Sequence, residues 1–264
     1  MSISDHPEVE EFVSFIHELA DAAGTFLSER HEGSRFETKP DASPVTEFDR
    51  GVETRLREMI RERYPEHGIV GEEFAPHNEE AEFVWIMDPI DGTKSFVVGI
   101  PIYTTLIALC HNGVPVIGVI NAPSSRDRFL GVEGRPTTLN DVPIRTSGRT
   151  ELDGATGAVS NPTKVIDSQR AGWADLEDRT AWWVYGAAAY GYGRLAAGGV
   201  DIAVESGTVG PYDINCLVPI IEGAGGKVTD GFGGPVLLTT GGTCVASATP
   251  ELHDQVLAVL NSGV

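Results

Sequence analysis

Basic residues are scarce in this chain of 264 residues. Lysine and arginine number 19 against 39 aspartates and glutamates, so the formal net charge is −20 at pH 7. Nucleic acids and anionic membrane surfaces attract proteins mainly through basic patches. The composition therefore argues against both as partners. An anionic substrate would need a local source of positive charge.

Paired cysteines and long apolar runs are also missing. Cys110, Cys216 and Cys244 are odd in number and far apart, which fits neither a disulfide framework nor a zinc site. No run approaches the length of about 18 apolar residues that a membrane helix needs. The stretch 1–24 is acidic with a helical pattern, unlike a secretory signal. These absences predict a cytoplasmic protein.

The first half of the chain has the periodicity of helices followed by strands. Apolar residues recur at helical spacing over 9–23 and over 46–64. A buried strand is predicted at 83–87. The β-like runs 103–110 and 116–121 flank an Asn-Gly turn signal, which predicts a hairpin. Consecutive antiparallel strands are inconsistent with a purely parallel sheet.

The second half alternates strands and helices. A strand at 180–185, a helix of small residues at 187–197 and a strand at 200–205 predict a βαβ unit. Asp213 opens a further helical stretch, and the last helix has Thr249 as its N-cap. We therefore expect an α+β fold of layered helices and sheets. It should form one domain over 1–264, with the loop-rich stretch 121–150 as an internal seam.

Carboxylates gather in four short motifs that core packing does not explain. They are Glu72 and Glu73 in GEEF, Asp88 and Asp91 in MDPIDGT, Asp213 in PYD, and Asp49 in SPVTEFD. Taken alone, Asp213 reads as a helix cap, Asp49 with Thr46 as a capping box, and Glu72 with Glu73 as a solvated loop. The Asp88–Asp91 pair is harder to explain, because one aspartate suffices for a turn and the second adds repulsion.

A divalent cation would make the Asp88–Asp91 pair favourable. Mg²⁺ prefers oxygen ligands and usually keeps several waters that a substrate can replace. Pro89 stiffens the spacer, so the carbonyl of Ile90 can point inward as a further ligand. Gly92 permits close approach of the backbone, and the N–H groups of Gly92 and Thr93 suit an anion. Metal ions beside amide donors predict a phosphate site and supply the missing positive charge.

The strings WIMDPIDGTKSF, GEEF and PYD…EGAGG together resemble the inositol monophosphatase family. The resemblance runs from Lys39 to about His253 in the family's order and spacing. It implies a layered αβαβα sandwich and Mg²⁺-dependent hydrolysis of a phosphate monoester. It also implies two or three metal ions, inhibition by Li⁺ and a homodimer.

Matching positions assign roles to individual residues by this resemblance. The metal ligands would be Glu72, Asp88, the Ile90 carbonyl, Asp91 and Asp213. Thr93 and Asp49 would orient or deprotonate the attacking water, with Glu72 acting through a third metal. Gly92 and Thr93 would bind the phosphate, and Ala188 and Glu205 would contact the substrate. Glu73 receives no role.

The substrate is predicted less directly. DGTKSFVVGIPIYTTLIAL, GRPTTLNDVPIRT and GPYDINCLVPIIEGAGGKVTD resemble the histidinol-phosphate phosphatase branch, and Glu205 would suit a cationic substrate. One departure favours inositol 1-phosphate or a broad range of sugar phosphates. Residues 186–190 read Gly-Ala-Ala-Ala-Tyr, where that branch commonly has an aspartate.

Two further alternatives are weaker. A 3′(2′),5′-bisphosphate nucleotidase would need a basic cluster for its second phosphate, and Arg194 is the sole candidate. A catalytically silent regulator that binds metal or phosphate could dispense with Thr93 or Asp49, yet both are present. The sequence therefore predicts a phosphatase that acts on a small phosphorylated metabolite, with histidinol phosphate as the expected substrate and inositol 1-phosphate or other sugar phosphates as the alternative.

Overall fold

The computed structural model describes residues 3–28, 36–39 and 44–263. In chain order its helices and strands are α1 Val9–Ser28, β1 Phe36–Thr38, β2 Pro44–Thr46, α2 Glu47–Arg63, β3 Gly68–Gly71, β4 Phe83–Asp91, α3 Thr93–Val98, β5 Thr104–His111, β6 Val114–Ala122, β7 Asp127–Val132, β8 Thr138–Leu139, β9 Val142–Pro143, β10 Thr156–Val159, α4 Arg170–Arg179, β11 Trp182–Tyr185, α5 Ala188–Ala196, β12 Ile202–Val209, α6 Pro211–Ile214, α7 Leu217–Gly223, β13 Lys227–Asp230, β14 Gly242–Ser247 and α8 Pro250–Leu260. No helix in these ranges is long and apolar enough to cross a membrane.

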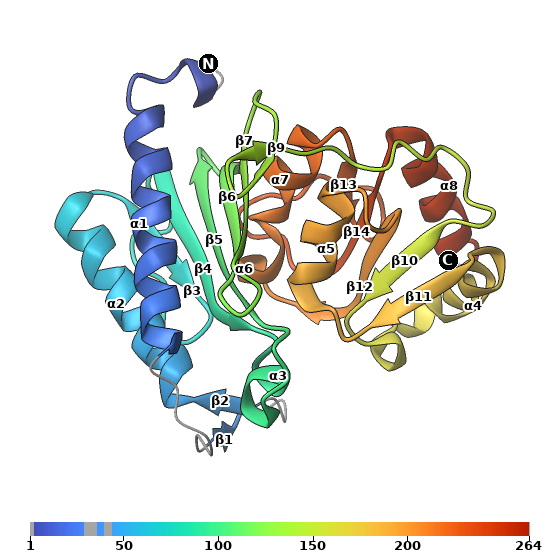
Figure 1. Cartoon of the computed structure of the whole chain (residues 1–264), viewed down its shortest axis with the longest axis horizontal. Coiled ribbons are helices and arrows are strands. Elements are labelled where there is room, and N and C mark those ends of the chain that lie inside the picture. Colours follow the sequence, from blue (N-terminus) through green and yellow to red (C-terminus); the bar gives the residue numbers. More distant parts are fainter. Residues whose placement is uncertain (1–2, 29–35, 40–43, 264) are drawn as a thin grey trace.

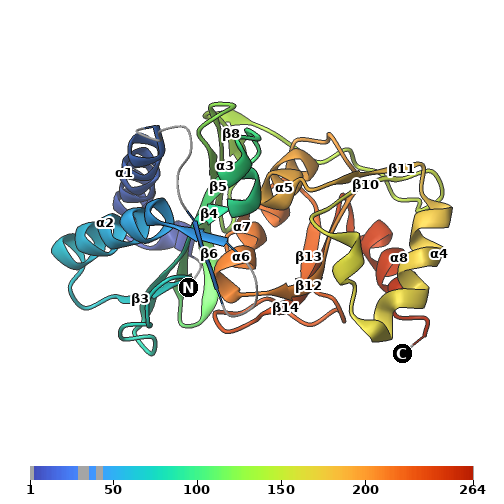
Figure 2. The ribbon, with the colours of Figure 1, turned by 90° about the horizontal axis from the view of Figure 1, so that it is seen from below.

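The helices and sheets stack in five layers (Figure 1). Helices α1 and α2 cover the outer face of a seven-stranded sheet, and α5, α6 and α7 lie between that sheet and a five-stranded one. Helices α4 and α8 lie at the far side of the second sheet (Figure 2). Separate apolar clusters fill the spaces between the layers. The predicted α+β fold with αβαβα layering is confirmed.

The first sheet has the strand order β3-β4-β5-β6-β7-β8-β9. The predicted hairpin is present as β5 and β6, and its turn places Asn112 at φ 51° and Gly113 at φ 80°. Two residues with positive φ suit the twist of a two-residue hairpin turn. The stretch 121–150 is less loop-like than expected, because β7, β8 and β9 within it continue the sheet.

The second sheet has the order β11-β10-β12-β14-β13. Strands β11 and β12 both run parallel to β10, so the predicted βαβ unit is present, with β10 inserted between its two strands. The helical stretch expected to open at Asp213 is instead two short helices, α6 and α7, and it begins at Pro211. The final helix α8 has the predicted N-cap, since Thr249 Oγ1 accepts from Leu252 N at 3.2 Å.

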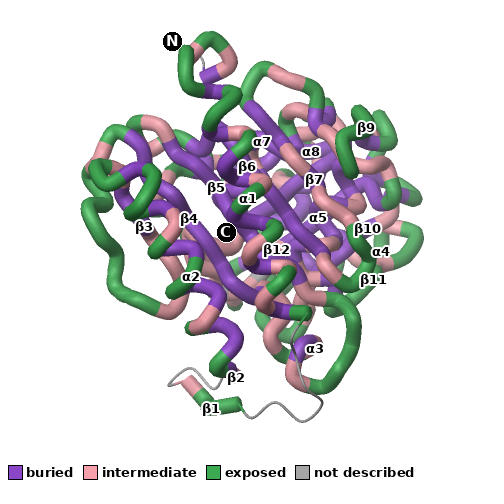
Figure 3. The backbone as a smooth tube through the Cα atoms, turned by 60° about the vertical axis from the view of Figure 1, so that its left-hand side comes forward, coloured by how far each residue is buried: buried purple, intermediate pink, exposed green. Residues whose placement is uncertain are grey.

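Strand β4 is a central strand that breaks register where the acidic motif begins. Its residues 83–90 are buried, and β4 is coloured accordingly in Figure 3. The pairing of β4 with β5 shifts between Asp88 and Asp91, around Pro89, which has no N–H to donate to the ladder. The break directs the carboxylates of Asp88 and Asp91 toward the space between the two sheets.

Candidate active site

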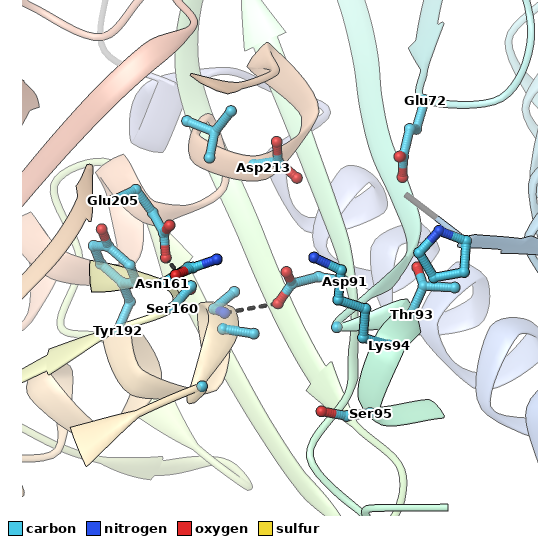
Figure 4. A pocket seen from close by; sticks show the side chains of 16 residues that line it. Glu72, Asp91, Thr93, Lys94, Ser95, Ser160, Asn161, Tyr192, Glu205 and Asp213 are labelled. Atoms are coloured by element: carbon cyan, nitrogen blue, oxygen red, sulfur yellow. Dashed lines mark hydrogen bonds between the residues drawn. The ribbon is translucent and has the colours of Figure 1, made fainter. Parts of the chain in front are cut away.

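A cavity of about 320 Å³ opens between the two halves of the molecule (Figure 4). The first half contributes residues from the motifs around β3 and β4, and the second half contributes residues that follow β10 and β11 or belong to β12 and α6. The lining residues that matter below are Glu72, Asp91, Gly92, Thr93, Lys94, Ser160, Asn161, Ala188, Ala189, Glu205 and Asp213. The structure thus brings predicted site residues from both halves together around one cavity.

Three carboxylates form the acidic centre of the site. Oxygens of Asp88, Asp91 and Asp213 all lie within 4.8 Å of one another. Burial, followed by the charges of neighbouring carboxylates, raises the pKa of Asp88 and of Asp213 well above its ordinary value. Burial also raises the pKa of Asp91, to about 6. A divalent cation would relieve this repulsion, so the donor set fits a hard metal ion.

Hydrogen bonds hold each of these carboxylates in place. Asp91 Oδ2 accepts from the N–H of Ala189 at 2.6 Å and from Thr104 Oγ1 at 3.1 Å. Asp88 Oδ1 accepts from Ile90 N at 2.9 Å. Asp213 Oδ2 accepts from the N–H of Gly210 at 2.6 Å. Asp213 therefore caps its helix, as its position in the sequence suggested, and also belongs to the acidic cluster.

Asp49 and Thr93 meet beside this cluster. Asp49 Oδ2 accepts from both the N–H and the hydroxyl of Thr46 at 2.6 Å, which completes the capping box. Its other oxygen accepts from Thr93 Oγ1 at 3.3 Å, and the same hydroxyl lies 2.8 Å from Ile90 O. Asp49 is 1% exposed, and burial raises the pKa of its carboxyl. One oxygen therefore caps α2 while the other reaches into the site.

Glu72 lies across the cavity from Asp213 (Figure 4). Lys39 Nζ lies 2.7 Å from Glu72 Oε1 and 2.5 Å from Glu73 Oε1. Glu72 is therefore turned toward an ammonium group, and it also lies close enough to Asp88 for its charge to raise the pKa of that aspartate. Glu73, for which no role was predicted, contributes to this ion pair.

The second half forms the wall opposite the DGT motif. The Ser160 hydroxyl donates to Glu205 Oε1, and burial raises the pKa of Glu205 to about 8. Ala188 lines the cavity with a positive φ of 51°, which turns the chain into α5. Ser160 and Asn161 were not predicted as site residues. Both residues directly follow β10, at the edge of the sheet where its parallel strands end. This position could have indicated them as site residues, but the sequence analysis did not identify β10.

A cluster of carboxylate oxygens between the two sheets of an αβαβα sandwich fits a metal-dependent enzyme. The family model for the inositol monophosphatase family matches residues 8–264, and the chain belongs to that family. Its members are metal-dependent phosphatases, so the prediction of a metal-dependent phosphomonoesterase is confirmed at this level.

Two curated relatives and one solved structure illustrate the similarity. The chain is 38% identical to a histidinol-phosphatase of Mycobacterium tuberculosis, over 87% of this chain and 89% of that protein. It is 36% identical to the bifunctional phosphatase IMPL2 of Arabidopsis thaliana, over 96% of this chain and 76% of that protein. The structure of an inositol monophosphatase from Zymomonas mobilis matches with a TM-score of 0.83 at 34% identity, covering 95% of this chain and 98% of that one.

Proposed function

We propose that the chain hydrolyses L-histidinol phosphate to L-histidinol and phosphate. The observation that carries the choice of substrate is Glu205, a carboxylate in the cavity wall opposite the DGT motif. Histidinol phosphate carries an amine and an imidazole, and a cationic group placed there would favour ionised Glu205. The similarity to a curated histidinol-phosphatase supports the same choice. Such an activity would belong to histidine biosynthesis.

Mg²⁺ is the proposed cofactor. Glu72, Asp88, the Ile90 carbonyl, Asp91 and Asp213 would hold two or three ions, because these groups offer only the oxygen ligands that Mg²⁺ prefers. When bound, the ions would neutralise phosphate charge and lower the pKa of a ligated water.

The remaining roles fall to the chain's own groups. The amides of Gly92 and Thr93 would donate to the phosphate oxygens, since both residues line the cavity. Thr93 Oγ1, held between Asp49 Oδ1 and Ile90 O, would orient the attacking water. Asp49 would receive the proton that Thr93 relays. The water oxygen would bond to phosphorus as the ester P–O bond breaks, and the leaving alkoxide would take a proton from solvent water.

Inositol 1-phosphate is the second candidate substrate. It is favoured by the small side chains of Ala188 and Ala189, which leave this part of the wall without a carboxylate. A hydroxyl-rich ring would need no counter-ion there. Ser160 and Asn161 would then supply hydrogen bonds to its hydroxyl groups.

A homodimer is proposed as the working assembly. Strand β11 lies at the edge of the second sheet, and Trp182 and Val184 on it are 52% and 44% exposed. Exposed apolar side chains on an edge strand favour association with another protein surface. Sedimentation at micromolar concentration would test this. A monomer would contradict it.

Phosphate release from a matched panel of esters tests the substrate. The panel contains L-histidinol phosphate, inositol 1-phosphate, glycerol 2-phosphate, fructose 1,6-bisphosphate and adenosine 3′,5′-bisphosphate, each with Mg²⁺ and each with excess EDTA. We expect kcat/KM for histidinol phosphate to exceed the others by about a hundredfold, which is about 2.7 kcal/mol of transition-state discrimination. A flat profile, or one led by inositol 1-phosphate, would contradict the proposed substrate but not the phosphatase activity.

A further inference from the structure

Helix α2 carries three buried charged residues on one face. Asp49, Glu53 and Arg57 follow one another at intervals of four and are 1%, 0% and 4% exposed. Residues four apart lie on the same side of a helix, so these side chains form one stripe. Asp49 begins the stripe in the active site. Glu53 and Arg57 continue it away from the cavity, and the proposed chemistry does not use them.

Glu53 accepts hydrogen bonds from the main chain that follows Glu72. Its Oε2 accepts from the N–H of Glu73 at 2.7 Å, and its Oε1 accepts from the N–H of Phe74 at 3.3 Å. Arg57 Nε donates to the same Oε1 at 2.7 Å. The carboxylate is therefore paired in charge, and it fixes two consecutive amides of a loop that belongs to no helix or strand.

Arg57 holds the same loop from its carbonyl side. Its Nη2 donates to the carbonyl of Phe74 at 3.0 Å, and its guanidinium lies 5.9 Å from the centre of the Phe74 ring. The forked guanidinium can bind Glu53 and the loop together, which a single ammonium group does less well. The loop is thus clamped to α2 through both its N–H and its C=O groups.

Gly71 allows the close contact that this clamp requires. A Cβ on Gly71 would lie 2.1 Å from Glu53 Oε1 and 2.4 Å from Glu53 Cδ. A larger residue would push the carboxylate away from the amides it binds. Glu72 is therefore flanked on one side by a glycine packed on Glu53, and on the other by an amide bonded to Glu53.

We infer that Glu53 and Arg57 are positioning residues that set metal affinity through Glu72. The charges of Asp88, Asp91 and Asp213 repel Glu72, and the clamp opposes its displacement by fixing the backbone on both sides. Because α2 also carries Asp49, the clamp fixes Glu72 relative to the residue proposed to take the proton. The inference rests on the proposed role of Glu72 as a metal ligand.

Mn²⁺ binding to the full chain tests the inference without using activity. The affinity is measured by electron paramagnetic resonance of free Mn²⁺, for wild type, Glu53→Gln, Glu72→Gln and the double variant. We expect Glu53→Gln to weaken Mn²⁺ binding about tenfold in the wild-type background and less than about twofold in the Glu72→Gln background. The effects of two substitutions are not additive in such a cycle when both residues act through the same group.

Ile60→Val is the matched control on the same helix. Ile60 is fully buried on α2 and contacts the apolar core, so this change should lower the melting temperature and leave Mn²⁺ affinity unchanged. If Glu53→Gln does not fold, Arg57→Lys takes its place, because it keeps the charge and loses the fork.

The outcomes separate the inference from the proposed function. Equal weakening in both backgrounds, or a lower melting temperature with unchanged Mn²⁺ affinity, would overturn the positioning role and leave the metal site standing. A wild-type chain that binds no Mn²⁺ would overturn the proposed function itself.

Discussion

The two halves of the molecule contribute different chemical groups to the shared cavity. The seven-stranded sheet and its helices supply Glu72, Asp91 and the DGT backbone to the lining, with Asp88 beside Asp91 and Asp49 bonded to Thr93. The five-stranded sheet supplies neutral or small groups together with a single carboxylate from β12. Asp213, in α6 between the sheets, completes the acidic cluster. We infer that the first half carries the chemistry and the second half selects the ester.

Two buried carboxylates, one from each half, illustrate opposite effects on stability. Asp88 lies among like charges, and its pKa is raised by burial and repulsion. Asp201, also buried, accepts from Ser147 Oγ at 2.6 Å and from the N–H and hydroxyl of Thr156 at 2.8 and 3.0 Å. A carboxylate satisfied by donors stabilises the fold, whereas a carboxylate held beside others destabilises it until a cation binds.

The largest effect is expected for Asp88→Asn. It should lower kcat/KM by about a thousandfold for every ester, because loss of metal stabilisation removes several kcal/mol at about 1.4 kcal/mol per decade. In EDTA the same change should raise the melting temperature by about 2–4 °C for each kcal/mol of repulsion relieved. Steady-state kinetics and calorimetry measure the two quantities.

Asp201→Asn is the control from the other half. It should lower the melting temperature and leave kcat/KM within about twofold, because it removes a bonded carboxylate far from the chemistry. If Asp88→Asn also destabilised the metal-free protein, the description of the cluster as a repulsive centre would be wrong.

An intermediate and selective effect is expected for Glu205→Gln. The change should reduce kcat/KM for histidinol phosphate by about tenfold or more, the value of a lost charged hydrogen bond. For glycerol 2-phosphate kcat/KM should fall less than about threefold, because this ester places no cation near Glu205. The Mg²⁺ concentration for half-maximal activity should not change. A uniform loss for both esters would mean that the second half also serves the chemistry.

The smallest effect on activity is expected for His253, on α8 in the second half. Burial, followed by the charge of Lys227, lowers the pKa of its imidazole to about 4 from an ordinary 6.5. The unfolded chain therefore takes up a proton at higher pH than the native chain. Stability from neutral His253 is complete above pH 6.5 and is lost as the pH falls toward 4, by about 2–3 kcal/mol.

Urea unfolding between pH 4 and 8 measures this loss. His253→Gln should make the free energy of unfolding depend less on pH. It should leave kcat/KM unchanged at pH 7.5. An unchanged pH dependence in the variant would show that other groups cause it.

The sequence predicted the first half of the site more fully than the second. Its motifs lie in consecutive strings with Pro89 and Gly92, so the residue types themselves reveal the local geometry. The hairpin and the capping box of Thr46 and Asp49 were likewise readable, because turn and cap signals are local.

The rest depends on contacts between distant segments. Strands β8 and β9 have two residues each, too short for any periodicity to be detected. Ser160 approaches Glu205 only because β10 and β12 pair. Glu53 and Arg57 look like an exposed helical pair in sequence, and their burial follows from the loop after Glu72 folding over α2. Tertiary contacts of this kind have no local signature.

A Mg²⁺ titration of phosphate release tests whether the first half of the molecule carries metal-dependent chemistry. Histidinol phosphate and inositol 1-phosphate are each hydrolysed from an EDTA-treated start, with and without Li⁺. We predict no release in EDTA, suppression by Li⁺, and the same half-saturating Mg²⁺ concentration for both esters, because the groups proposed to hold the metal are not the ones proposed to select the substrate. Undiminished release in excess EDTA would contradict this prediction.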